Sequence, residues 1–233
     1  MAPRWRRRGA VSIVLFLFLS SKVSNSRTLA LWSPSRSHGL TVAVRIFDVE
    51  IRRELNVAEC ELLSEETAEA ADENGELGGN ALYQDLRGAT WAHVRAVLEV
   101  EGALIRRVAE AADPAAAEAE YEEQRDTDPD NLEGLCGLDL GVAAAAAALS
   151  ALGATPFISC NAGSFGGHHP AKCPYVAFYL SSASPARLLA LAEAAGVGFG
   201  MRDGPITLYA RSIIDLREFA QRAADDASQT GQA

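Results

Sequence analysis

The chain has 233 residues, a formal net charge of −10 and 48% hydrophobic residues, enough apolar sequence to build a sizeable buried core. The charge is unevenly divided, because residues 1–47 contain eight Arg or Lys and no acid, whereas residues 48–233 hold all 31 acids and 13 bases. An acidic body of this kind repels phosphate backbones, which argues against nucleic acid as a partner.

Residues 1–41 form a basic leader with two main interpretations. Its four early arginines, the apolar run "AVSIVLFLFL" and the Ser24-Asn25-Ser26 triplet are typical of a secretory signal covering residues 1–26. The Arg- and Ser-rich character continues to His38, which indicates instead a mis-assigned start, with the protein beginning near Val42. A transit peptide fits less well, because the apolar run is uninterrupted. The first interpretation predicts a secreted protein and the second a cytoplasmic one.

The apolar run of the leader is too short to cross a bilayer as a helix, so the sequence predicts no integral membrane span. The heavy use of Arg and Ala is typical of a GC-rich bacterial genome and carries no functional meaning.

Residues 42–130 are predicted to form an acidic, mainly helical portion. Near-alternation of apolar residues over 42–53 indicates a short strand, and 54–80 is predicted to be a helix followed by a flexible loop. Apolar residues at helical spacing predict a long helix over about 90–112. Asp113 and Pro114 are typical of a second helix start, although this helix looks too polar to be central.

Residues 131–226 are predicted to hold a helix, with six consecutive alanines, and a duplicated ββα core. The first unit has strands 155–160 and 175–182 and helix 185–196; the second has strands 197–202 and 206–212 and a helix from 213. We expect an α+β fold: an antiparallel sheet of four to five strands built from two ββα units, with helices packed on one face. Residues 227–233 are predicted to be a disordered tail. The acid-free stretch 140–192 suits burial within the monomer or across a homodimer.

The most distinctive segment is the loop of the first hairpin. It spans residues 161–174, "NAGSFGGHHPAKCP", whereas the equivalent turn of the second unit is only residues 203–205. Hairpin loops usually need two to five residues, and longer ones tend to be functional. This loop and the strand end before it contain sulfur and imidazole groups that zinc prefers, which predicts a metal site with ligands Cys160, His168, His169 and Cys173.

Three alternatives compete with the zinc site. Cys160 and Cys173 can form a disulfide if the protein is secreted. Cys160 can act as a catalytic thiol with His168 or His169 as base, although the surrounding stretch has no acid, so Asp139 or Asp203 would have to approach through the fold. The thiols can also be small buried side chains without a ligand role. The leading hypothesis is a small acidic binding or regulatory protein that recognises a ligand or protein through this loop.

Overall fold

The structure is a computed structural model that describes residues 30–31, 43–167, 169, 171–201 and 204–231. The leader lies outside these residues except for Ala30–Leu31, which form strand β1 and pair antiparallel with β2 (Ala43–Val44). The signal-peptide and mis-assigned-start interpretations therefore stay predictions. Within the described residues, no helix is long and apolar enough to cross a membrane.

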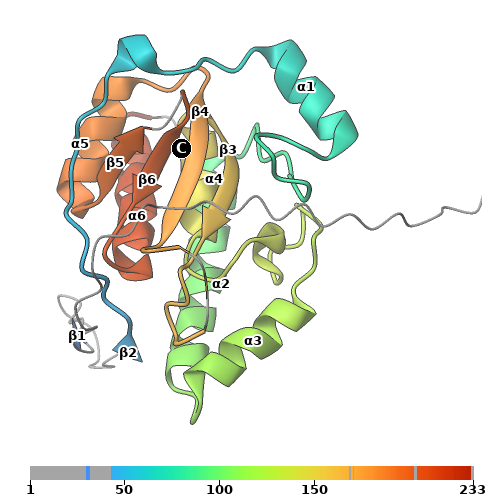
Figure 1. Cartoon of the computed structure of the whole chain (residues 1–233), viewed down its shortest axis with the longest axis vertical. Coiled ribbons are helices and arrows are strands. Elements are labelled where there is room, and N and C mark those ends of the chain that lie inside the picture. The colour runs from blue at the N-terminus through green and yellow to red at the C-terminus, as the bar shows by residue number, and fades with distance from the viewer. Residues whose placement is uncertain (1–29, 32–42, 168, 170, 202–203, 232–233) are drawn as a thin grey trace, which may run out of the picture.

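A four-stranded antiparallel sheet forms the centre of the molecule, in the order β3-β4-β6-β5 (Figure 1). Its strands are β3 (Ala154–Cys160), β4 (Tyr175–Leu180), β5 (Gly198–Met201) and β6 (Ile206–Tyr209). Helices α4 (Ala143–Ala151), α5 (Pro185–Ala195) and α6 (Ile213–Gln229) lie behind one face of the sheet. The predicted α+β class is confirmed.

The main core lies between the sheet and these helices. Phe178 from β4, Phe199 from β5 and Leu208 from β6 are almost fully buried there. The six consecutive alanines of α4, Ala143–Ala148, are all buried, so their small side chains let this helix lie close to both β3 and the neighbouring helices. Helix α2 (Trp91–Ala109) packs against α4 and α6 and belongs to the same core.

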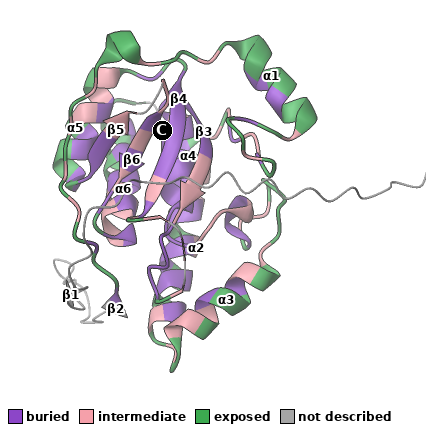
Figure 2. Ribbon diagram, viewed as in Figure 1, coloured by how far each residue is buried: buried purple, intermediate pink, exposed green. Residues whose placement is uncertain are grey.

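The opposite face of the sheet carries a smaller apolar cluster. Phe157 and Tyr179 stack there with ring centroids 4.7 Å apart, beside residues from and after α1 (Glu65–Asn74). The Asn80 side chain donates to the Phe157 carbonyl at 2.6 Å, which satisfies a backbone group of the edge strand β3. Figure 2 shows that α1 itself is mostly exposed, so this face is less thoroughly covered than the first.

Two expectations need correction. The predicted strand 42–53 is reduced to Ala43–Val44, and the following segment makes only isolated contacts with the sheet, such as the Phe199 N–H bond to the Arg52 carbonyl at 2.7 Å. Val44 and Phe47 are buried there and Ile46 is exposed, so the apolar residues do not line one face of a continuous strand. At the other end, α6 continues to Gln229 and Ala227 is fully buried, where the sequence predicted a disordered tail.

Candidate functional site

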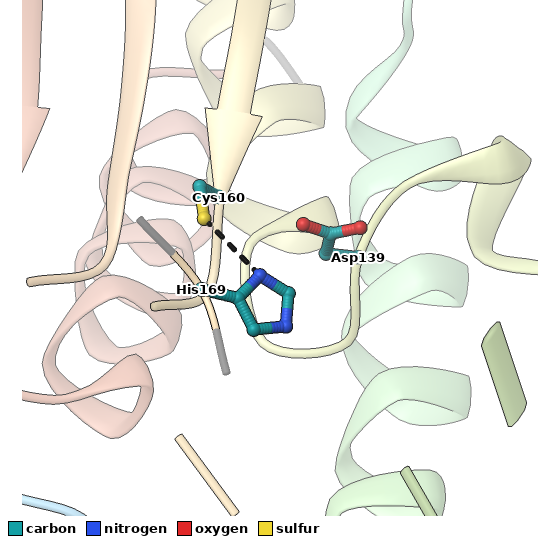
Figure 3. Close-up of side chains that lie close together, drawn as sticks. All are labelled: Asp139, Cys160 and His169. Atoms are coloured by element: carbon teal, nitrogen blue, oxygen red, sulfur yellow. Dashed lines mark hydrogen bonds between the residues drawn. The ribbon is translucent and has the colours of Figure 1, made fainter. Parts of the chain in front are cut away.

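Cys160 lies at the end of edge strand β3, where it pairs in register with Tyr175. Its Sγ is 3.5 Å from Nδ1 of His169 (Figure 3). The same Sγ accepts the Ala162 N–H at 3.4 Å. Burial raises the pKa of the Cys160 thiol to about 11. The thiol is therefore protonated at neutral pH, unless a cation or another positive group replaces the proton.

Asp139 completes a group of three ligand types. It lies in the connection before α4, and one of its carboxylate oxygens, Cys160 Sγ and a ring nitrogen of His169 all lie within 4.8 Å of one another (Figure 3). All three residues are partly buried. Arg125 forms an ion pair with Asp139 and fixes the carboxylate beside the thiol.

The loop after β3 is held in shape by Asn161. This side chain is fully buried and donates to Glu118 Oε1 at 2.7 Å and to the Leu140 carbonyl at 3.1 Å. Its own Oδ1 accepts the Gly163 N–H at 3.0 Å, and Ala162 adopts a left-handed conformation with φ of +58°. The chain thereby turns back sharply, and His169 returns to the end of β3.

Helix α3 (Pro114–Gln124) supplies the acidic side of the site. Glu118, Tyr121 and Glu122 share one face of the helix, with Arg125 just past its end, because residues three and four apart are neighbours on a helix. Glu118 is only 2% exposed. As expected from its polarity, this helix lies at the border of the fold (Figure 1), and it buries only Glu118 and Tyr121, on the face that turns toward the site.

The carboxylates of α3 lie on the far side of the His169 ring from the thiol. Glu122 Oε1 is 3.6 Å from His169 Nε2, and a Glu118 oxygen belongs to the same group within 4.8 Å. Burial, and secondly the charge of Glu122, raise the pKa of the Glu118 carboxyl. His169 therefore stands between a thiol on one side and two acids on the other.

The structure brings together only part of the predicted ligand set. Cys160 and His169 meet, as expected for a shared site, whereas Cys173 belongs to neither ligand group among the described residues. Cys173 is a partly buried free thiol, and burial raises its pKa to about 11. His168 and Asp203 lie outside the described residues. Asp139 does approach Cys160 and His169 through the fold. Glu118 and Glu122 were not predicted from the sequence as site residues.

Comparisons with protein-family models, with curated proteins and with solved structures give no match for this chain. The class of protein therefore follows from the fold and the geometry of the site. These describe a small α+β protein with a Cys, His and carboxylate cluster at the end of an edge strand.

Proposed function

We propose that the protein is a zinc-dependent binding or regulatory protein, with the ion held by Asp139, Cys160 and His169. The observation that carries this proposal is the convergence of three ligand types from three separate segments within 4.8 Å. Thiolate, imidazole and carboxylate are the groups that bind zinc in proteins.

The measured separation of the soft ligands suits a shared zinc ion. Sγ and Nδ1 are 3.5 Å apart. Two such ligands on a tetrahedral zinc are roughly 3.6 Å apart, given usual Zn–S and Zn–N bond lengths. Zinc would replace the thiol proton, which compensates for the burial that disfavours a free thiolate at Cys160.

Two of the three ligands also have a charged neighbour that can hold them in position. Arg125 orients Asp139, and Glu122 faces the ring nitrogen of His169 that points away from Cys160. A carboxylate behind a ligating imidazole fixes the tautomer of the ring. Three protein ligands leave a fourth zinc position for a water or for a group on a bound partner, as in zinc sites that do more than support the fold.

The test is elemental analysis and zinc competition on the full chain. We expect one tightly bound zinc per chain at this position, and at least a roughly 100-fold loss of affinity in Cys160→Ser and His169→Ala. Cys173→Ser is the matched control: it should keep its zinc, since Cys173 lies in neither ligand group. Unchanged zinc binding in Cys160→Ser would reject the proposal, and zinc loss in Cys173→Ser would restore the ligand set predicted from the sequence.

A second function, a thiol enzyme, is favoured by the order of groups around His169. Nδ1 faces the Cys160 thiol and Nε2 faces Glu122, as a base between a nucleophile and an orienting acid requires. The raised pKa of Cys160 counts against it, because a catalytic thiol needs its pKa lowered.

Alkylation of metal-free protein with iodoacetamide separates these two functions. For the zinc protein, the rate at Cys160 should keep rising up to pH 10, since the thiol pKa is about 11. A rate that levels off near neutral pH, and does so only when His169 is present, would favour the enzyme. Cys60→Ser removes a thiol outside the site and serves as the background control.

The disulfide alternative and the compartment are tested together. Cys160 and Cys173 are both free thiols in this structure. Counting reactive thiols in the native protein after unfolding without reductant gives four for a chain without disulfides and two for one with a Cys160–Cys173 bridge. The native N-terminal residue decides between secretion after cleavage near residue 26 and a cytoplasmic protein that begins near Val42.

A further inference from the structure

The carboxylate side of His169 has polar atoms that are not ligands in the zinc site above. Glu118 and Glu122 lie one turn apart on α3, and one oxygen of each is within 4.8 Å of a His169 ring nitrogen. Both residues come from a helix that contributes nothing to the Asp139, Cys160 and His169 group. This side of the ring is therefore built by an independent element.

Two buried oxygens at this position have no hydrogen-bond partner in the described structure: Glu118 Oε2 and Glu122 Oε1. Glu118 is almost completely buried, and its other oxygen is already occupied by the Asn161 side chain at 2.7 Å. Burying a carboxylate oxygen without a partner is costly, and two adjacent ones repel each other. A positive group between them would remove both penalties.

The distance across this gap is too long for a hydrogen bond and suits a shared cation. Glu122 Oε1 and His169 Nε2 are 3.6 Å apart. A nitrogen and an oxygen bound to the same tetrahedral ion are roughly 3.4 Å apart, whereas an N–H···O hydrogen bond rarely exceeds about 3.2 Å. The gap thus resembles the edge of a coordination shell.

The hairpin loop passes close to Glu118 at a glycine. Gly167 lies against Glu118 Oε2, and a Cβ added at this glycine would stand 3.1 Å from that oxygen. Any larger side chain would fill the space beside the carboxylate. The loop glycine, the Glu118 carboxylate and His169 Nε2 therefore lie next to one another.

We infer that Glu118, Glu122 and His169 Nε2 form a second divalent-cation position, so that His169 bridges two metal ions. The inference rests on the proposed zinc site for the ion at Nδ1. The second cation forms a bond to Nε2 and displaces the proton there, which passes to solvent. The ring is then an imidazolate, and its charge, with those of Asp139, Cys160 and the two glutamates, is matched by two divalent ions and Arg125.

The donor types at the two positions differ. The first includes a thiolate, which favours zinc, whereas the second has two carboxylates and an imidazole, which also suit Mn²⁺ or Fe²⁺. The protein as proposed is therefore a dinuclear metal protein with one soft and one harder position.

Cobalt titration of the full chain tests this inference, because a thiolate-to-cobalt charge-transfer band reports only the position that contains Cys160. We expect the wild type to bind two Co²⁺ per chain. Glu118→Gln/Glu122→Gln should bind one and keep the band, whereas Cys160→Ser should lose the band. Glu120→Gln/Glu123→Gln is the matched control, since it makes the same charge change at exposed positions of α3 and should still bind two.

The outcomes separate the two proposals. One Co²⁺ with the band in the wild type overturns the second position and leaves the first intact, and so does a Glu118→Gln/Glu122→Gln variant that still binds two. A wild type without the band rejects the zinc site instead. The bridge itself predicts magnetic coupling in the doubly loaded protein, so an EPR spectrum equal to the sum of two isolated Co²⁺ ions would overturn it. Unfolding curves confirm that each variant is folded.

Discussion

Two glutamates, Glu101 on α2 and Glu118 on α3, are both almost completely buried, yet their surroundings have opposite charge. Glu101 Oε1 accepts the N–H groups of Gly141, Ala143 and Ala144 at 2.9–3.3 Å, at the start of α4. Arg217 is also close enough to favour its ionised form. Glu118 accepts from one side chain, Asn161, and burial together with the charge of a second acid, Glu122, raises the pKa of its carboxyl.

This difference distinguishes a structural acid from a functional one better than burial does. The start of a helix is the positive end of its dipole, so Glu101 is a cap supplied by a neighbouring helix. Beside Glu118 the fold places a second acid, Glu122, and one basic side chain, His169, which is shared by both acids. Two buried acids that share one imidazole form a position that a cation from outside the chain can complete.

The largest expected effect is the loss of stability in Glu101→Ala. This change leaves three buried N–H groups without an acceptor and creates a cavity in the core, so the free energy of unfolding should fall by about 4 kcal/mol. Glu118→Ala should cost only about 1–2 kcal/mol, because it loses one hydrogen bond and relieves repulsion between acids. Urea unfolding measures both, and equal losses would show that the two residues have the same role.

The pH dependence of stability should depend on the same cap. Burial raises the pKa of Glu101 to about 7, from an ordinary value of 4.5. Below pH 4.5 the carboxyl is protonated in both states, and between pH 4.5 and 7 it ionises only in the unfolded chain. The free energy of unfolding should therefore fall by about 3 kcal/mol over this interval.

Glu101→Gln cannot ionise, so this contribution should disappear from its curve of unfolding free energy against pH. Glu99→Gln, an exposed change on the same helix, should follow the wild type. If the Glu101→Gln and wild-type curves run parallel from pH 4.5 to 7, the carboxyl has no raised pKa in the folded protein.

Zinc should stabilise the folded chain by a similar or smaller amount. At a free zinc concentration 100 times Kd, a site that exists only in the folded state adds about 2.7 kcal/mol. In the Glu118→Gln/Glu122→Gln background, which removes the second position, thermal unfolding with and without zinc should show this gain with Cys173 unchanged or changed to Ser, and no gain when Cys160→Ser is added. A gain that survives in Cys160→Ser would place the ion elsewhere.

Most of the fold follows from local signals in the sequence. Thr90, Ser184 and Ser212 accept N–H bonds at the starts of α2, α5 and α6, and the apolar spacing of α2 matches its buried face. The strand predicted over 42–53 failed because alternation alone does not supply a partner strand. Pairing is decided by the tertiary fold, which turns this segment into an irregular border of the sheet.

Only part of the site could be predicted from the sequence, because the rest also depends on the tertiary fold. Cys160 and His169 are close in the chain, so a turn suffices to bring them together. Asp139 and the acids of α3 come from distant segments, and their approach depends on how α3 packs. The sequence did contain a local signal. Glu118, Tyr121 and Glu122 are spaced so that they share one face of a helix, and Glu118 and Tyr121 on that face are buried.

The smallest effect is expected for a substitution at Gly167. This substitution tests the side of His169 that faces Glu118 and Glu122, and it changes no charge. Gly167→Ala needs no unusual backbone conformation, but its Cβ would crowd Glu118 Oε2 at 3.1 Å. We expect the second Co²⁺ to bind roughly fivefold more weakly, equivalent to about 1 kcal/mol, with the first unaffected. Gly200→Ala is the matched control, because its Cβ would lie 3.8 Å from the nearest Tyr209 ring atom. Equal affinities in the two variants would mean that the space beside Glu118 holds no ion, and the contrast between the two buried acids would then reflect packing alone.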